Sequence, residues 1–404
     1  MNIVDGRGPT VSLASNVGPT YQGGLGAYQR LLARLLKQRT NCLSTVFCAT
    51  THLDFLPPTE ERSALPLVQF ERSWLGKASE PIWNRLASKP QAHPVLEFIL
   101  HRAWRSPRTA RTNVIHYIGT GWDFFGFAIA KLARDYRVRL VITPAIHPGS
   151  WGSDLIDVRL YHQADRVICF TNQEGVFLQQ LGLPQQKLSV CPLPPMCRSD
   201  GHGLRFRNKY HLENQLCVLF VGRRDQGKGY PALLKAWLLV LQSIPDAVLI
   251  LAGTAGEEYR EFLARIPNRN VCDLGTPNEI EKADAIAACD IFCLPSAHES
   301  FGIVYVDAWS YGKPVICGTA PACREFIDDG KTGLWASQEP NELAEKLVLL
   351  SKDRELRKVL GSAGKLEQVK RFNEATFLRS HLNAFGIPAR GDNDETPANE
   401  GITV

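Results

Sequence analysis

The feature that most constrains the fold of this chain is an alternation of short apolar segments with amphipathic segments, which runs through the sequence twice. In the first half, strand-like segments cover 113–119, 137–147, 166–172 and 187–195, and helix-like segments cover 121–136, 154–164 and 174–183. The second alternation begins at Cys217 and continues past residue 340. Such alternation is typical of parallel sheets with helices on both faces. The chain is therefore predicted to be an α/β protein.

The length of 404 residues exceeds what one ordinary core supports, so two domains are expected. Residues 195–213 are polar and lack periodicity, which makes them the best linker candidate. We expect two Rossmann-like domains facing a cleft, one over residues 1–198 and one over 199–371. Residues 389–404 are polar and are expected to be disordered.

Composition narrows the class of protein. The chain is 44% hydrophobic and 22% charged, as soluble globular proteins are, and it has no run of eighteen apolar residues. The N-terminus shows no signal-peptide pattern, and the eleven scattered cysteines include no CxxC pair. A cytoplasmic protein without structural zinc is expected. The net charge of +5 permits an anionic substrate but does not require nucleic acid, and no nucleic-acid partner is expected.

A basic and aromatic stretch covers residues 72–111. It holds eight Lys or Arg residues against two acids, with tryptophan and phenylalanine interleaved. Such a stretch can lie on an anionic membrane, so peripheral contact with the inner face of a membrane is one interpretation. The other interpretation, which the irregular hydrophobic spacing favours, is a solvated helical face whose tryptophans point into the core.

Two glycine-rich turns lie directly before predicted helices. Gly23 and Gly24 precede a helix rich in leucine, where free backbone N–H groups favour an anion. The run from Gly222 to Gly229 follows a strand and carries Arg223 and Lys228, which can both reach a diphosphate. It is not a Walker A loop, because Gly229 occupies the Ser/Thr position. Either turn can also be a surface turn without a ligand.

A third turn, at 295–303, precedes a helix whose start is framed by two acids eight positions apart. Glu299 precedes the helix that begins near Ile303, and Gly302 leaves the N–H groups of that helix uncovered for a diphosphate or a sugar hydroxyl. Asp307 lies one turn into the helix. The simpler interpretations are a helix N-cap for Glu299 and an ordinary exposed acid for Asp307.

Two histidines, His116 and His147, are both assigned to predicted strand ends in the first half. Ligands of parallel sheets bind at the carboxyl ends of strands, so both residues are site candidates. A histidine in a loop is more often an ordinary polar residue.

The combined pattern resembles glycosyltransferase family 4, strongly over residues 215–375 and more weakly over the first half. The motifs that carry the resemblance occur in this order: Gly23-Gly24, Gly222-Arg223-x4-Lys228-Gly229, Pro295-Ser296-x2-Glu299-x-Phe301-Gly302, Asp307-Ala308, Gly312-Lys313-Pro314-Val315-Ile316 and Gly330-x2-Gly333-Leu334. The resemblance implies the two-domain GT-B fold, with the acceptor on the first domain, the donor on the second, and a last helix over 372–388 that crosses back to the first domain.

The resemblance also implies roles for individual residues. Arg223 and Lys228 match the cations that neutralise the donor diphosphate, and Glu299 matches the acid that faces the donor sugar. Asp307 matches the acid that holds the ribose, although the family has Glu there. The catalytic set implied is Glu299, Arg223, Lys228 and His147. The donor-binding set is Gly23, Gly24, Arg223, Lys228, Glu299, Ser300, Phe301, Gly302, Ile303 and Asp307, with His116 and Trp122 on the acceptor side.

The activity implied is that of a retaining hexosyltransferase. It moves a sugar from a UDP- or GDP-linked donor to a hydroxyl of a glycan, lipid-linked or small-molecule acceptor, in glycan or glycolipid synthesis. Cations and a helix N-terminus can stabilise the leaving diphosphate without a metal ion or other cofactor. The alternatives are a sugar-nucleotide epimerase of the same fold and a degenerate transferase that only binds nucleotide-sugar.

Overall fold

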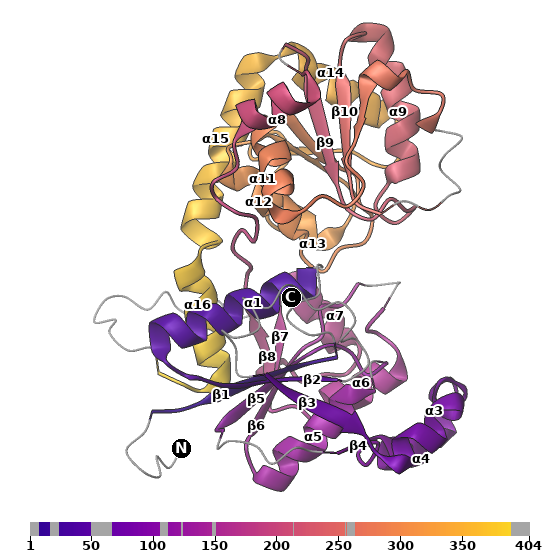
Figure 1. Cartoon of the computed structure of the whole chain (residues 1–404), viewed down its shortest axis with the longest axis vertical. Coiled ribbons are helices and arrows are strands. Elements are labelled where there is room, and N and C mark those ends of the chain that lie inside the picture. The colour runs from indigo at the N-terminus through magenta and orange to yellow at the C-terminus, as the bar shows by residue number, and fades with distance from the viewer. Residues whose placement is uncertain are drawn as a thin grey trace. The chain divides into compact units, whose positions relative to one another are not determined.

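The computed structural model describes residues 8–16, 24–49, 67–105, 112–122, 124–147, 151–212, 214–254, 256 and 263–388. The chain divides into two compact units, the first made of residues 1–192 with 375–404 and the second of residues 193–374. The tail at 389–404 and Gly23, both named in the sequence analysis, lie outside the described residues. Each unit is a parallel α/β sheet with helices on its faces (Figure 1), as predicted.

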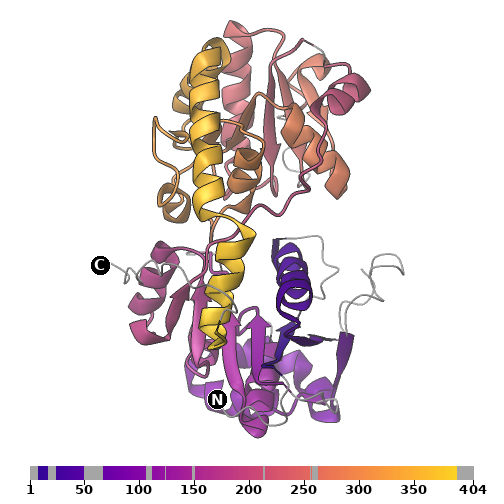
Figure 2. The same cartoon turned by 90° about the vertical axis from the view of Figure 1, so that its left-hand side faces the viewer.

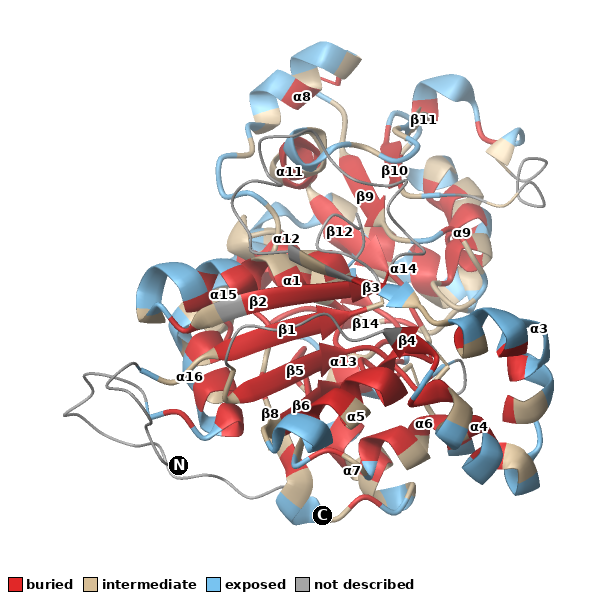
Figure 3. Cartoon of the chain, turned by 60° about the horizontal axis from the view of Figure 1, so that its bottom comes forward, coloured by how far each residue is buried: buried red, intermediate tan, exposed pale blue. Residues whose placement is uncertain are grey.

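The first unit contains an eight-stranded sheet in the order β4-β3-β2-β1-β5-β6-β7-β8. Every pair is parallel except β3 with β4. The central strands are buried along their whole length (Figure 3), as expected where helices cover both faces. The strands are β1 (Val11–Ser15), β2 (Leu43–Ala49), β3 (Leu67–Arg72), β4 (Trp104–Arg105), β5 (Val114–Ile118), β6 (Arg139–Thr143), β7 (Arg166–Cys169) and β8 (Leu188–Val190).

The helices of the first unit build a different core on each face of this sheet. On one face, Ile115 and Tyr117 of β5 pack into a large apolar cluster with residues of α3 to α7. On the other face lie α1 and α16, and Figure 2 shows α16, in yellow, against the strands. The helices are α1 (Gly24–Leu35), η1 (Leu36–Thr40), α3 (Trp74–Ala87), η3 (Pro90–Ala92), α4 (His93–Leu100), α5 (Phe125–Tyr136), α6 (Leu155–Tyr161), α7 (Asn172–Gln180), η4 (Gln185–Lys187) and α16 (Glu374–Phe385).

A buried polar cluster joins α16 to α1 and the sheet. The hydroxyl of Tyr28 lies 2.6 Å from Nε2 of His381 and 3.3 Å from Oγ1 of Thr143, and Nε2 of His116 lies 2.8 Å from the same Thr143 oxygen. Nδ1 of His381 lies 2.7 Å from the carbonyl oxygen of Phe377, so it carries the proton. Nε2 of His381 therefore accepts the hydrogen bond from Tyr28.

We expect this cluster to make the first unit acid-sensitive. Burial lowers the pKa of His381 to about 4, and burial together with the charge of His381 lowers the pKa of His116 well below its usual range. Histidine in the unfolded chain titrates near 6.5. The contribution of the neutral histidines to the free energy of unfolding is therefore complete above about pH 6.5 and is lost as the pH falls toward about 4. Thermal unfolding across that window measures the effect. His381→Gln keeps an acceptor for Tyr28 but does not titrate, and an equally steep decline in this variant would contradict the assignment.

The second unit contains a six-stranded parallel sheet in the order β11-β10-β9-β12-β13-β14. Figure 1 shows α9 and α14 on one side of it and α8, α11 and α12 on the other. The elements are α8 (Gly203–Tyr210), β9 (Cys217–Val221), α9 (Tyr230–Ser243), β10 (Val248–Ala252), η6 (Asn268–Asn270), β11 (Val271–Asp273), α11 (Glu279–Ala288), β12 (Ile291–Leu294), α12 (Ile303–Ser310), β13 (Val315–Cys317), α13 (Pro321–Arg324), β14 (Leu334–Trp335), α14 (Pro340–Lys352) and α15 (Arg354–Arg371).

The segment expected to be a linker, 195–213, contains the helix α8. Phe206 of α8 is fully buried, Arg205 forms an ion pair with Asp284, and Arg207 forms one with Asp290. The acids come from residues about 80 positions later in the chain. Tertiary contacts therefore stabilise a helix whose own sequence has no clear apolar face.

Candidate functional site

Two loops lie side by side in the second unit, at the carboxyl ends of the neighbouring parallel strands β9 and β12. The first loop covers residues 222–229 and the second covers 295–302. The backbone N–H of Ala297 donates to the carbonyl of Gly227 at 2.9 Å, and the hydroxyl of Ser296 donates to the same oxygen at 3.3 Å. The side-chain amide of Gln338 donates to the carbonyl of Pro295 at 2.9 Å. The two predicted donor turns are thus joined into one structure.

An ion pair connects the two loops through their charged side chains. Nζ of Lys228 lies 2.6 Å from Oε1 of Glu299 and 3.4 Å from the carbonyl oxygen of His298. Both side chains of the pair are largely buried. The sequence separates them by 71 positions. A cation and a carboxylate that both belong to the predicted donor set therefore lie in direct contact at the ends of the strands.

Glycine is required in both loops for steric reasons. Gly229 has φ +73°, and a Cβ there would lie 2.4 Å from the carbonyl oxygen of Pro295. Gly302 has φ +84°, and a Cβ there would lie 2.7 Å from the ring of Tyr305 and 2.8 Å from Sγ of Cys323. Left-handed backbone and close contacts together exclude any side chain. These glycines fix how the loops approach each other and how α12 begins.

The N-terminus of α12 carries no side-chain cap at its N-cap residue, Gly302. Its N–H groups and the helix dipole favour an anion at this position. Ser300 and Ile303, both predicted to bind donor, are partly exposed beside it. Phe301 is different, because its side chain is buried and stacks on Phe326 with ring centroids 5.1 Å apart. Only the backbone of Phe301 is placed for the role predicted for this residue.

The adjacent arginines of the first loop have different environments. Arg223, the predicted diphosphate cation, is 63% exposed, with Nε 3.0 Å from Oδ2 of Asp225. Arg224 is buried, and both of its terminal nitrogens bond to the carboxylate of Asp273 at the end of β11. Arg223 is therefore on the surface, where it can reach an anion. Arg224 instead links the loop to the sheet through its bonds to Asp273. No signal in the sequence distinguishes Arg224 from an ordinary surface cation.

Asp307 is not the ordinary exposed acid of the simpler interpretation. It is buried, and its Oδ1 accepts hydrogen bonds from the backbone N–H groups of Met196 at 2.7 Å and Cys197 at 3.0 Å. Burial raises its pKa, an effect that the charge of Lys282 and these two N–H groups oppose. The described contacts of Asp307 thus hold the start of the second unit against α12. Its implied role as the ribose ligand stays a prediction.

Lys282 is a residue that the sequence analysis did not select. Its Nζ lies 2.8 Å from Oε2 of Glu279, and its side chain is largely buried. Burial alone would lower the pKa of Lys282, but the charges of Asp307 and Glu279 raise it overall. The charge of this largely buried lysine acts on Asp307, so it adds positive potential near the predicted donor residues. An (i, i+3) acid and lysine pair on a helix is common, so the sequence alone does not single it out.

In the first unit, Gly24 is the first residue of α1 and is exposed. His147 follows β6 and is partly exposed; its Nδ1 lies 2.5 Å from the indole nitrogen of Trp151. Trp122 follows β5, is partly exposed and donates from its indole nitrogen to Oδ2 of Asp154 at 2.5 Å. The roles predicted for these residues stay predictions.

His116 occupies a different place from the one expected. It lies in the middle of β5 rather than at its end, and it has no exposed surface. Its ring packs against His381 and Phe385 of α16. This burial contradicts direct contact with an acceptor. The residue serves the core between the sheet and α16 because alternate residues of a strand point to opposite faces.

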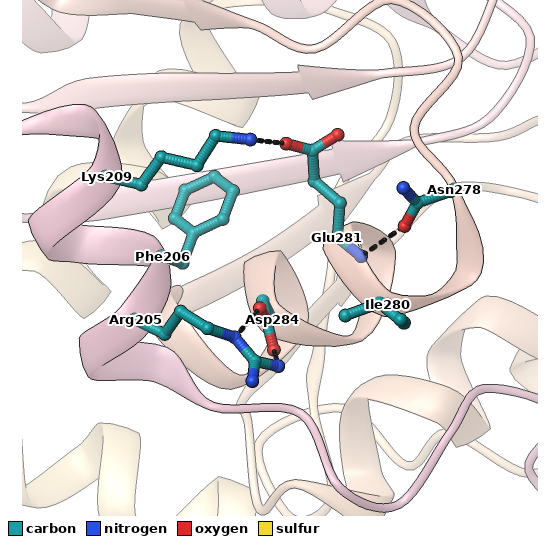
Figure 4. Close-up of a pocket in the computed structure, with 7 residues that line it drawn as sticks. All are labelled: Arg205, Phe206, Lys209, Asn278, Ile280, Glu281 and Asp284. Carbon is teal, nitrogen blue, oxygen red and sulfur yellow. Dashed lines mark hydrogen bonds and ion pairs between the residues drawn. The ribbon is translucent and has the colours of Figure 1, made fainter.

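A separate cavity of about 260 Å³ lies between α8 and α11 (Figure 4). Arg205 pairs with Asp284 across it at 2.6 Å, and Lys209 pairs with Glu281 at 2.5 Å. None of the residues that line it belongs to the predicted donor set. Its charged side chains neutralise one another, so the cavity presents no charge to a ligand.

The described residues contain neither a metal-ligand cluster nor a helix that could span a membrane. No group of three or more His, Cys, Asp or Glu side chains among those residues is arranged to hold a metal ion. Across the same residues, no helix combines the length and the apolar character needed to cross a bilayer.

Comparison with known proteins gives one family match and several relatives. The family model described as "Glycosyl transferases group 1" matches residues 205–367. A phosphatidyl-myo-inositol mannosyltransferase of Mycobacterium leprae is 35% identical over 159 residues, which are 39% of this chain and 42% of that protein. An uncharacterized 41.2 kDa protein in the cps region of Klebsiella pneumoniae is 26% identical over 59% of this chain and 70% of that protein. The alignment thus spans less than half of the mannosyltransferase.

Solved structures match nearly the whole chain. HepE of Anabaena in complex with UDP-glucose superposes with a TM-score of 0.69 at 20% identity, covering 93% of this chain and 99% of HepE. Sucrose-phosphate synthase of Thermosynechococcus elongatus superposes with a TM-score of 0.70 at 19% identity, covering 93% and 98%. The chain therefore has the GT-B fold, and the match to the family model lies within its second unit.

Proposed function

We propose that this protein is a retaining glycosyltransferase that moves a hexose from a UDP- or GDP-linked donor to an acceptor hydroxyl, in glycan or glycolipid synthesis. The observation that carries the proposal is the contact between Lys228 and Glu299 beside the uncapped start of α12. It combines a cation and helix N–H groups for a diphosphate with a carboxylate for sugar hydroxyls. These groups lie inside the region that the family model matches.

Donor binding must break the ion pair between Lys228 and Glu299 and supply a new partner to each residue. Lys228 and Glu299 neutralise each other at 2.6 Å, so a donor has to take both as partners at once. The diphosphate then replaces Glu299 as the partner of Lys228, and sugar hydroxyls donate to the released carboxylate. Arg223 is exposed, and a swing away from Asp225 adds a second cation to the diphosphate. The pair keeps two buried charges compensated until the donor arrives.

The proposed chemistry is a front-face substitution with retention at the anomeric carbon. The bond between that carbon and the diphosphate oxygen breaks as the acceptor oxygen forms its new bond on the same face. The departing phosphate oxygen takes the acceptor proton. Negative charge grows on the diphosphate, and Lys228, Arg223 and the N–H groups of α12 stabilise it. Since these groups supply positive charge themselves, we propose transfer without a metal ion or other cofactor.

The names of the similar proteins support a proposal about the chemical class of the donor and of the acceptor. One is by name a mannosyltransferase of phosphatidyl-myo-inositol, and one solved structure holds UDP-glucose. We therefore propose a UDP- or GDP-hexose as donor and a lipid-linked or glycan hydroxyl as acceptor. His147 and Trp122 are proposed to serve in the first unit, His147 beside the donor sugar and Trp122 toward the acceptor.

A two-stage experiment tests the proposal. The protein is screened with UDP-, GDP- and ADP-sugars for thermal stabilisation, where a ligand at a hundred times its Kd adds about 2.7 kcal/mol. The stabilising donor is then incubated with glycan and lipid-linked acceptors in the presence of EDTA. We expect transfer with a retained anomeric configuration, read by NMR of the product.

The outcomes separate this proposal from its alternatives. An inverted product contradicts front-face substitution, and a rate abolished by EDTA contradicts metal-free transfer. Conversion of the donor alone into an isomeric sugar, rather than simple hydrolysis, indicates an epimerase. Stabilisation by a donor with neither transfer nor hydrolysis indicates a protein that only binds nucleotide-sugar.

A further inference from the structure

A helical excursion interrupts the strand and helix alternation of the first unit. Between β3 and the short antiparallel strand β4, the chain forms α3, η3 and α4 at one edge of the sheet. The hydroxyl of Ser73 caps α3 by accepting from the N–H of Gly76 at 3.1 Å, and it donates to the carbonyl of Arg102 at 2.6 Å. These bonds bring the start of α3 beside the end of α4.

The inner side of this excursion is a well-packed core. Trp83 and Trp104 are buried, and the guanidinium of Arg72 lies 5.4 Å from the centroid of each ring. Leu96 and Leu100 of α4 join the same apolar cluster. The excursion is therefore a rigid platform whose outward side chains are held in defined positions.

The outer side exposes large apolar side chains. Trp74 is 77% exposed and Phe98 is 56% exposed, and Val95 and Ile82 are also on the surface. Figure 3 shows exposed turns along the outer side of both helices. Single exposed apolar residues are normal on a protein surface. Four on one pair of helices, including a largely exposed tryptophan, indicate an interaction surface for a membrane or a protein.

The same surface is basic. Lys77, Arg85, Lys89 and Arg102 are exposed on and around the two helices, and the guanidinium of Arg102 lies 3.9 Å from the ring centroid of Phe98. Trp74, Lys77 and Arg85 are three and eight residues apart, so they lie on the side of α3 opposite its buried residues, with cations beside an apolar group. Glu80, the exposed acid on α3, is paired with Arg72.

We propose that the outer surface of α3 and α4 is a docking surface for an anionic lipid bilayer. Tryptophan and phenylalanine enter the boundary between headgroups and acyl chains, while the cations stay at the level of the phosphates. A protein partner fits less well, because the apolar side chains are interspersed with like charges rather than gathered in a neutral patch. The inference goes beyond sugar transfer and stands whether or not the protein is a transferase.

Flotation with lipid vesicles tests the proposal on the full chain. Vesicles of phosphatidylcholine alone are compared with vesicles that contain about one third phosphatidylglycerol, at low and high salt. We expect binding to the anionic vesicles that weakens at high salt. Lys77→Gln with Arg85→Gln should weaken it about fivefold per charge removed. Trp74→Ser with Phe98→Ser should weaken it at least about tenfold.

A matched control uses exposed apolar residues in the second unit. Val359 and Leu366 of α15 are 60% and 54% exposed, and changing both to serine should leave vesicle binding unchanged. All changed side chains are on the surface, and thermal unfolding checks that every variant folds. Quenching of tryptophan fluorescence by brominated acyl chains should fall in Trp74→Phe.

Three results would overturn the proposal. One is equal binding to neutral and anionic vesicles, or none to either. Another is unchanged anionic binding in the double serine variant of α3 and α4. The third is a lipid-free sedimentation coefficient that drops in that variant, which would show that the surface pairs with a second copy of the chain.

Discussion

Lys228→Ala is expected to lower kcat/KM by about tenfold to a thousandfold, because one of the charges that stabilise the leaving diphosphate is lost. The change also leaves Glu299 largely buried without its cation, 2.6 Å from where Nζ stood. An unpaired buried charge destabilises a fold, so part of the loss can arise from unfolding. Steady-state kinetics and denaturant unfolding must therefore be measured on the same preparations.

A second variant separates catalysis from stability. Lys228→Ala combined with Glu299→Gln removes both charges of the pair, so we expect stability to recover while transfer stays low. Lys235→Ala, at an exposed lysine of α9, is the matched control and should have unchanged kinetics. Normal turnover in a folded Lys228→Ala protein would show that the two loops are not the donor site. Recovery of activity in the double variant would mean that Lys228 only compensates Glu299.

Asp307→Ala is expected to lower the free energy of unfolding of the second unit by about 1–3 kcal/mol. The N–H groups of Met196 and Cys197 both donate to its Oδ1, and removing that acceptor leaves them unsatisfied. Asp307→Asn keeps an oxygen in the same place, so it should remain within about 1 kcal/mol of the native protein. Denaturant unfolding measures both variants, with Glu345→Ala on the exposed side of α14 as the control.

Hydrogen exchange at residues 196 and 197 gives an independent measurement. The two amides should exchange faster in Asp307→Ala and near the native rate in Asp307→Asn. If Asp307→Ala is as stable as the native protein and binds donor more weakly, the carboxylate faces the ribose instead. That result would favour the role implied by the sequence motif.

The loops of the candidate site could be predicted because glycine and charge mark them locally. Gly229 and Gly302 sit at left-handed backbone positions that no side chain tolerates, and each precedes an apolar helix. Strand ends place such turns together in any parallel sheet. The direct contact of Lys228 with Glu299 could not be predicted, because it depends on β9 and β12 being neighbours although β10 and β11 lie between them in sequence.

The errors of the sequence interpretation share one physical cause, which is burial by distant segments. His116 is predicted to lie at a strand end, but it lies in the middle of β5 and α16, from the far end of the chain, covers it. The simpler interpretation of Asp307 as an exposed acid is wrong, because contacts with residues 196 and 197 bury it. The segment of α8 is predicted to be a linker, but acids of α11 form ion pairs with it and stabilise it as a helix. The apolar periodicity of a segment does not show which distant segments of the chain will pack against it.

The sequence by itself determined the α/β class, the presence of two parallel sheets and the position of the loops that carry Lys228 and Glu299. These features follow from local pattern, since apolar periodicity sets the elements and glycine sets the turns. Only the tertiary structure decided which charges meet, which histidine is buried and which aromatic side chains of 72–105 stay on the surface. Those outcomes depend on strand order and on helices returning from far along the chain, which no local pattern encodes.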